Sequence, residues 1–215
     1  MIFDIDIAKQ VAKSLLQIKA IILQPNNPFV WASGWLSPIY CDNRKILSFP
    51  KERTFIRQNL VNIIRKQYQN SNIVAGVATG GIPHGILVAE ELGLPFIYVR
   101  SSVKEHGKQN QIEGHYNERD SVIMIEDLIS TGKSSLDARR AIQDAKLDVK
   151  AIISIFNYGF KKAEKNFKKE TCEYVSLCNY KILLEEALKI NYINKKDIPL
   201  LESWSKAPEK WNPNG

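Results

Sequence analysis

Two adjacent acids, Glu126 and Asp127, follow an apolar run and precede a loop of small residues that opens a helix. The run Val122–Ile125 has the length and composition of a buried central strand. The loop Ser130–Gly132 would let a phosphate approach backbone N–H groups at a helix N-terminus. Paired carboxylates can accept hydrogen bonds from two neighbouring sugar hydroxyls. The segment therefore predicts a site for a ribose phosphate.

Gly132, Lys133 and Ser134 look like the end of a nucleotide-binding P-loop, but the match fails. That motif begins with a glycine at the position that Asp127 holds here. The negative charge of Asp127 would repel the phosphates that such a loop binds. Two interpretations remain, a loop for a sugar phosphate and a plain strand–turn–helix with Ser or Thr at the helix N-cap.

A second segment, Tyr98–His115, contains almost nothing that could be buried and predicts a long mobile loop, called the lid loop below. Arg100, Lys104 and His106 supply cationic hydrogen-bond donors, and glycines within the segment supply hinges. Taken alone, this composition favours a solvated surface loop. The alternative is a lid that closes over an anionic substrate.

Several separated segments resemble the type I phosphoribosyltransferases, and among them the orotate phosphoribosyltransferases. Val122–Ser135 is similar to their ribose-phosphate signature, and Arg100–Gly114 to their catalytic loop. Trp31–Arg44 resembles their base-binding segment, and Val77–Gly85 their pyrophosphate-binding turn. The purely structural alternative for Val77–Gly85 is a tight strand-to-helix turn that binds no ligand, with Pro83 in the first helical turn.

This resemblance implies transfer of ribose 5-phosphate from 5-phosphoribosyl 1-diphosphate (PRPP) to orotate, giving orotidine 5′-monophosphate and diphosphate in pyrimidine biosynthesis. Mg²⁺ would arrive with PRPP and need no direct protein ligand. The implied catalytic residues are Lys104, His106 and Asp127. The implied PRPP-binding residues are Arg100, Lys104, His106, Glu126, Asp127, Leu128, Ile129, Ser130, Thr131, Gly132, Lys133 and Ser134, with Thr79, Gly80 and Gly81 in the pyrophosphate turn. The implied orotate-binding residues are Pro38, Ile39, Tyr40 and Ser130.

The resemblance also implies a homodimer in which the lid loop reaches the site of the neighbouring subunit. Two positions depart from the family pattern. Leu36 replaces a lysine found in many members, and Asn157–Phe160 contains no arginine where some members carry one for orotate. Orotate would then be held by Ser130, by backbone groups around Pro38–Tyr40 and by apolar and aromatic walls. Ser130 also differs from the Asp of hypoxanthine-specific members, and its hydroxyl can donate to a carboxylate.

Composition fits one cytoplasmic domain, residues 1–215, in which residues 1–45 contribute a small N-terminal hood for the base. Three cysteines without a CxxC pair predict a reduced protein without structural zinc. The sequence shows no signal peptide or membrane-spanning run. A net charge of +7 raises nucleic-acid binding as a rival class. The lysine-rich runs Lys161–Lys169 and Lys189–Lys196 lack interleaved aromatics, so solvated helix faces and no nucleic-acid partner are expected.

Alternating elements predict an α/β fold, with a mainly parallel central sheet and helices on both faces. Helices are expected at Asp4–Leu23, Lys51–Tyr68, Pro83–Leu92, Gly132–Ala145, Phe160–Phe167 and Tyr180–Lys189. Strands are expected at Ile73–Ala78, Pro95–Arg100, Val122–Glu126, Val149–Phe156 and Glu173–Leu177. The segment from Trp204 is expected along the surface or as a loose end. Two other functions stay open: a phosphoribosyltransferase for another base, and a non-enzymatic regulator that senses PRPP.

Overall fold

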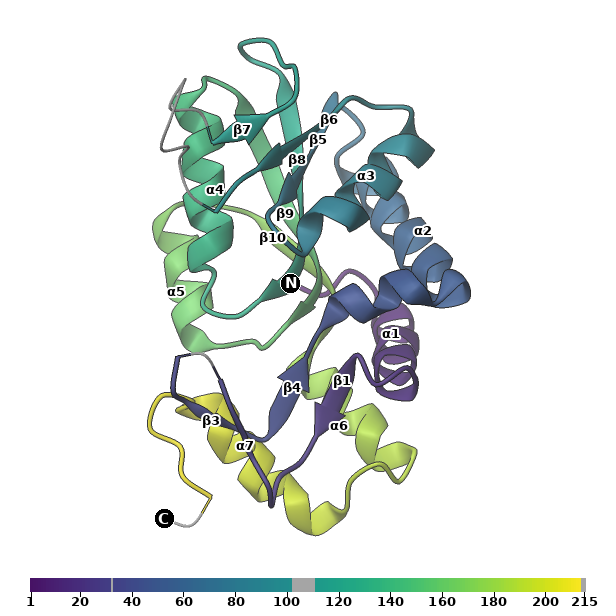
Figure 1. Cartoon of the computed structure of the whole chain (residues 1–215), viewed down its shortest axis with the longest axis vertical. Coiled ribbons are helices and arrows are strands. Elements are labelled where there is room, and N and C mark those ends of the chain that lie inside the picture. The colour runs from purple at the N-terminus through teal and green to yellow at the C-terminus, as the bar shows by residue number, and fades with distance from the viewer. Residues whose placement is uncertain (32, 102–110, 214–215) are drawn as a thin grey trace.

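The computed structural model describes residues 1–31, 33–101 and 111–213. Its centre is a six-stranded sheet in the order β10-β9-β8-β5-β6-β7, in which every neighbouring pair is parallel except β6 and β7 (Figure 1). The strands are β5 (Ile73–Val77), β6 (Phe96–Val99), β7 (Ile112–Glu113), β8 (Ser121–Ile129), β9 (Asp148–Asn157) and β10 (Tyr174–Asn179). The predicted α/β fold with a mainly parallel sheet is confirmed.

Helices cover both faces of this sheet. One face packs against α1 (Ile5–Gln17), α2 (Pro50–Gln67) and α3 (Gly81–Leu92), and the other against α4 (Lys133–Asp144) and α5 (Lys161–Lys169). Strand β8 alternates between them: Ile123 and Ile125 belong to the first core, and Val122 and Met124 to the second. Because side chains alternate, consecutive residues of β8 reach different helices.

Four short strands and the last helices form the lower part of the molecule in Figure 1. Strand β1 (Ile21–Leu23) pairs antiparallel with β4 (Ile39–Cys41), and β2 (Phe29–Val30) with β3 (Leu36–Ser37). The helical elements are η1 (Asn43–Ser48), α6 (Tyr180–Lys189), η2 (Lys195–Asp197) and α7 (Ile198–Lys206), of which α6 and α7 lie beside these strands. The predicted hood segment is therefore accompanied by the C-terminal part of the chain.

The prediction of one helix from Asp4 to Leu23 is wrong. Helix α1 ends at Gln17, and Lys19 has a φ of 54°, in the left-handed region that stops a helix. Ile21 and Leu23 then point their side chains into the core from strand β1. The apolar residues beyond the helix end therefore belong to a new element with a different period.

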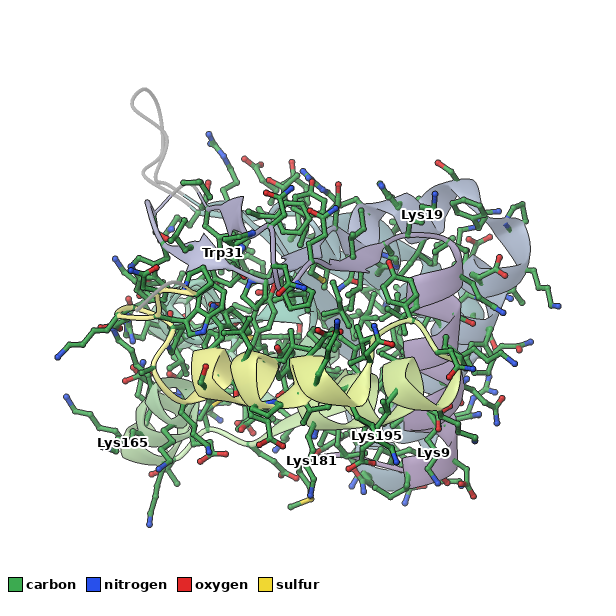
Figure 2. All side chains as sticks on the ribbon, turned by 90° about the horizontal axis from the view of Figure 1, so that it is seen from below. Lys9, Lys19, Trp31, Lys165, Lys181 and Lys195 are labelled. Atoms are coloured by element: carbon green, nitrogen blue, oxygen red, sulfur yellow. The ribbon has the colours of Figure 1, made fainter. Side chains whose placement is uncertain are left out.

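The segment from Trp204 lies along the surface, which was one of the two predicted alternatives, and the other, a loose end, is wrong. Trp204 in α7 has no exposed surface, and its ring packs edge-on against Trp31 at 5.7 Å and Tyr158 at 5.5 Å between centroids. Figure 2 views this end from below, with α7 crossing it and Trp31 on the strand side. The labelled lysines, among them Lys165 and Lys181, extend outward from separate elements.

None of the helices in the described part of the chain has the length and apolar character of a membrane-spanning segment.

Candidate active site

The loop between β8 and α4 lies at the carboxyl end of a central strand, where ligands bind such sheets. Gly132 caps α4 with a φ of 77°, and a Cβ there would lie 2.5 Å from the ring of Phe167. The Asn166 amide donates to the Thr131 carbonyl at 3.0 Å and fixes the preceding turn. Only glycine meets both conditions at position 132, so the loop presents the N-terminus of α4 to an anion.

The two acids of the predicted ribose-phosphate site point to opposite faces of the sheet. Strand β8 extends through Ile129, so both acids lie within it. Glu126 is only 4% exposed, accepts a hydrogen bond from Ser135 Oγ at 2.8 Å, and accepts another from the Asp127 N–H at 3.1 Å. Asp127 is half-buried on the other face. The structure thus leaves Asp127 as the more accessible carboxylate.

Burial, and then the neighbouring Asp127 carboxylate, raise the pKa of Glu126 well above its usual range. The folded chain therefore binds this proton more tightly than the unfolded chain, so stability falls as pH rises from the ordinary carboxyl range through the raised pKa. Glu126→Gln keeps an oxygen for the Asp127 N–H and removes the titration. We expect it to be more stable than the wild type at about pH 8, with the difference shrinking towards about pH 5.

Urea unfolding at both pH values measures this difference, and Glu118→Gln, at an exposed residue paired with Lys146, is the matched control. A Glu126→Gln protein that is less stable at every pH would show that the charged carboxylate stabilises the fold.

The predicted pyrophosphate turn packs directly against Asp127. A Cβ on Gly80 would lie 2.2 Å from Asp127 Cγ, and one on Gly81 would lie 2.3 Å from the Ile125 carbonyl oxygen. The turn therefore requires glycine at both positions, while the neighbouring Thr79 is exposed. Behind it lies His84, which is buried and has a pKa lowered by desolvation, although Asp127 opposes that shift. The pyrophosphate turn and Asp127 therefore form one packed unit.

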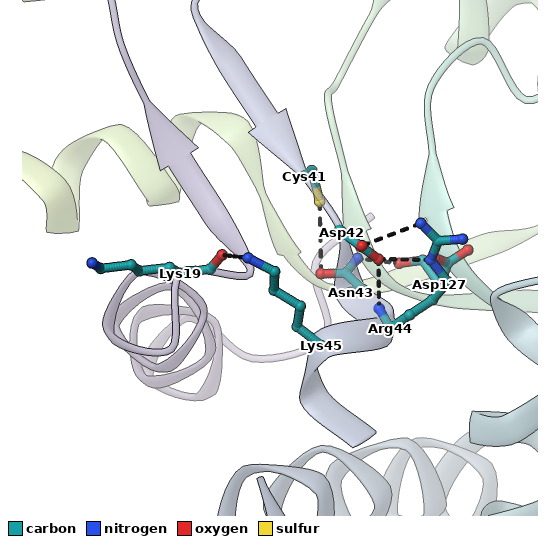
Figure 3. Close-up of polar contacts among 7 residues, drawn as sticks. All are labelled: Lys19, Cys41, Asp42, Asn43, Arg44, Lys45 and Asp127. Atoms are coloured by element: carbon teal, nitrogen blue, oxygen red, sulfur yellow. Dashed lines mark hydrogen bonds and ion pairs between the residues drawn. The ribbon is translucent and has the colours of Figure 1, made fainter. Parts of the chain in front are cut away.

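Asn43 connects the hood segment to this unit. Its side-chain amide donates to the Asp127 carbonyl at 2.7 Å, and it is fully buried (Figure 3). The neighbouring Arg44 and Asp42 pair through Nε and Oδ1 at 2.7 Å. Sequence reasoning did not assign Asn43 a role. The available signal was a polar residue two positions after Cys41, at the end of the segment that resembles the base-binding segment of the family.

A cavity of about 610 Å³ opens beside the phosphate loop. Ser130, Thr131 and Leu128 line it from the end of β8, and Tyr40 from β4. The remaining lining residues are mostly aromatic or small: Val30, Trp31, Ser33, Trp35, Cys41, Tyr158 and Lys162. Burial raises the pKa of the Tyr158 phenol, which keeps that wall neutral. A flat base can bind between such walls, next to a ribose phosphate on the loop.

Other predicted base contacts lie beneath this cavity. Pro38 and Ile39 are buried, and the Ile39 carbonyl already accepts hydrogen bonds from Trp31 Nε1 at 3.2 Å and Ser37 Oγ at 2.8 Å. Of the predicted orotate contacts Pro38, Ile39 and Tyr40, only Tyr40 is among the described residues that line the cavity. Leu36 packs against the larger core as a half-buried side chain. Tyr158, from the segment Asn157–Phe160 in which some family members carry an arginine, lines the cavity.

A smaller cavity of about 180 Å³ lies on the other side of the phosphate loop. Arg100 and Ser101 line it with Lys133 and Ser134 from the start of α4. Arg100 also lies 3.8 Å from the Glu113 carboxylate. The structure thus brings the first cation of the lid loop to the phosphate loop. Lys104 and His106 lie outside the described residues.

Comparisons with known proteins agree with this geometry. Residues 43–188 match the family described as Phosphoribosyl transferase domain. The chain is 48% identical over 205 residues to an orotate phosphoribosyltransferase of Porphyromonas gingivalis, covering 95% of this chain and 98% of that protein. It is 51% identical over 203 residues to one of Phocaeicola vulgatus, covering 94% and 96%. A crystal structure of the Aeropyrum pernix orotate phosphoribosyltransferase superposes with a TM-score of 0.75 at 27% identity, covering 86% of this chain and 99% of that one.

The fold, the phosphate loop and these matches define a phosphoribosyltransferase, and the chain belongs to that family. Its high identity to curated relatives over nearly their whole length places it, within the family, among the orotate phosphoribosyltransferases.

Proposed function

We propose that the protein transfers the ribose 5-phosphate group from PRPP to orotate, forming orotidine 5′-monophosphate and diphosphate in pyrimidine biosynthesis. The observation that carries this proposal is the position of the phosphate loop, which lies between an aromatic base cavity and a smaller cavity whose lining includes Arg100 and Lys133. Nearly full-length similarity to orotate phosphoribosyltransferases supports the choice of base. The proposal takes residues 1–215 as one domain, with residues 1–45 supplying the hood.

The phosphate loop would hold the 5′-phosphate. Leu128–Ser134 supplies the end of β8, the turn and the first residues of α4, so backbone N–H groups there face the same anion. Asp127 would accept hydrogen bonds from the ribose hydroxyls. Glu126, which now binds Ser135, would reach a hydroxyl only by exchanging that bond. These contacts fix the sugar so that its anomeric carbon faces the base cavity.

The leaving diphosphate would be bound from the opposite side. Thr79–Gly81 offers backbone close to Asp127, and Arg100 lines the adjacent cavity. Lys104 of the lid loop would add positive charge as the glycosidic bond to diphosphate breaks and charge develops on the leaving group, and His106 would donate a hydrogen bond to it in its protonated or its neutral form. Closure of that loop would exclude water from the cationic sugar that forms in the transition state.

Mg²⁺ fits this site as a companion of the substrate. Among the described residues no cluster of three or more His, Cys, Asp or Glu side chains could hold a metal by itself. Magnesium commonly binds substrate phosphates and water, so the ion would need no direct ligand from the protein. Bound in this way, the ion would neutralise charge on the diphosphate.

The homodimer and the cytoplasmic location belong to the same proposal. A lid loop shared between subunits would make each site depend on two chains. All three cysteines, Cys41, Cys172 and Cys178, are free thiols, which fits a reducing compartment.

A panel of bases tests the function. Purified protein is incubated with PRPP, Mg²⁺ and either orotate, uracil, hypoxanthine or adenine, and loss of the base and release of diphosphate are followed. We expect turnover with orotate at a kcat/KM at least about 10³-fold above that for uracil, because the site must bind the carboxylate that orotate has and uracil lacks. Turnover with another base would keep the family and change the substrate. Binding of PRPP without turnover of any base would indicate a sensor instead of an enzyme.

A further inference from the structure

Orotate differs from uracil by a carboxylate on the pyrimidine ring, and that negative charge must be compensated when the base enters the cavity. An unpaired charge is expensive in a site walled by Trp31, Trp35 and Tyr158. The two positions at which the family resemblance led us to look for a cation are neutral here, since Leu36 packs against the core and Asn157–Phe160 contains no arginine. A cation elsewhere in the lining of the cavity would supply that compensation.

Lys162 is the one charged side chain among the described residues that line the base cavity. It lies in the first turn of α5, just after the turn that follows β9. This places it at the same carboxyl edge of the sheet as Ser130, which also lines the cavity. Lys162 also lines the neighbouring cavity of about 310 Å³, together with Glu209.

In the structure the Lys162 ammonium pairs with Glu209, with Nζ and Oε1 2.7 Å apart. Both side chains are largely solvated, 58% and 47% exposed, so the pair contributes little stability and exchanges easily. Lys206 and Lys210 line the same neighbouring cavity and could compensate Glu209 once Lys162 leaves. The flexible stem of lysine allows its ammonium to turn from one cavity to the other.

We propose that Lys162 exchanges Glu209 for the carboxylate of orotate and thereby selects orotate over uracil. This inference rests on the proposed function, because it names the residue that recognises the base in the same reaction. Glu209 acts as a stand-in carboxylate that holds the ammonium while the cavity is empty. A carboxylate bound between aromatic walls competes well, since screening by water is weaker there than at the exposed pair.

Lys162→Gln tests this inference, with Lys165→Gln as its control on the same helix, where Lys165 extends outward (Figure 2). We expect Lys162→Gln to raise the KM for orotate by about 10- to 100-fold, the usual effect of losing a hydrogen bond to a charged group, with the KM for PRPP unchanged. Lys162→Arg should restore much of the affinity. Lys165→Gln should leave both constants unchanged.

Binding of orotidine 5′-monophosphate and uridine 5′-monophosphate, measured by calorimetry, isolates the carboxylate because the two nucleotides differ only there. The wild type should prefer the first, and Lys162→Gln should lose about 10-fold or more of that preference through weaker binding of the carboxylate nucleotide alone. Glu209→Gln should act in the opposite direction and strengthen its binding by up to about fivefold, because the competing carboxylate is gone.

An unchanged preference in Lys162→Gln, with normal folding by circular dichroism, would overturn the role of Lys162. If that variant does not fold, Glu209→Gln decides, and an unchanged affinity of Glu209→Gln for orotidine 5′-monophosphate would also overturn it. Failure of the proposed function looks different: the wild type itself would not turn over orotate.

Discussion

Asp127→Asn is expected to lower kcat/KM by about 10²- to 10³-fold, the usual loss when one charged group that stabilises a transition state is removed. The asparagine has the shape of the aspartate, so its contact with Gly80 and the bond from Asn43 to its backbone carbonyl are kept. What changes is the charge that accepts ribose hydroxyls and faces the cationic sugar. Steady-state kinetics with both substrates measures the effect.

Asp148→Asn is the control for this change, because Asp148 is exposed and lies at the amino end of β9, whereas the phosphate loop lies at the carboxyl ends of the strands. The control should keep full activity, and urea unfolding should give similar stability for both variants. A loss of less than tenfold in Asp127→Asn would remove Asp127 from the catalytic residues. A large loss of stability would instead assign it a structural role.

Lys104→Ala should reduce kcat by about 10²- to 10³-fold without changing the free energy of unfolding. The reason is its place in the sequence: Lys104 follows Arg100, which lines the cavity beside Lys133, by four residues, and the family resemblance assigns Lys104 to the diphosphate. Lys108→Ala, in the same loop, is the matched control for loss of a positive charge. A fall in stability with full turnover of the folded fraction would contradict the lid assignment.

Mixing the Lys104→Ala and Asp127→Asn proteins tests whether sites are shared between subunits. If the lid loop acts on the neighbouring site, a dimer of one chain of each kind has one intact site and one doubly altered site. Random exchange should then restore about a quarter of the wild-type activity. No recovery, although native mass spectrometry shows mixed dimers, would mean that each lid serves its own subunit.

Most of the sheet was predictable because parallel buried strands are continuous apolar runs and their helices have a clear period. The phosphate loop was predictable for a related reason, since Gly132 and its neighbours are required by local backbone geometry. Strand β8 was predicted to end at Glu126 but continues to Ile129, because pairing with β9 extends it. That extension places Glu126 and Asp127 on opposite faces, which a motif alone does not show.

Tertiary contacts explain the remaining errors. Trp204 looks like part of a polar, proline-punctuated tail, and its burial depends on rings contributed by Trp31 and Tyr158 from distant parts of the chain. Lys162 looks like one of many solvated lysines, and only the position of the base cavity distinguishes it. The rule that ligands bind at the carboxyl ends of parallel strands was the signal that could have drawn attention to the residues after β9.

The contact between Trp31 and Trp204 also fixes the order in which the two halves of the site can be completed during synthesis. The phosphate half needs β5, β8, β9, α4 and α5, which end at Lys169. The base half needs α7, whose Trp204 packs against Trp31 and Tyr158 of the cavity wall, and α7 leaves the ribosome after all the elements of the phosphate half. A nascent chain can therefore acquire a phosphate-binding loop before it can enclose a base, and it becomes selective only when α7 docks.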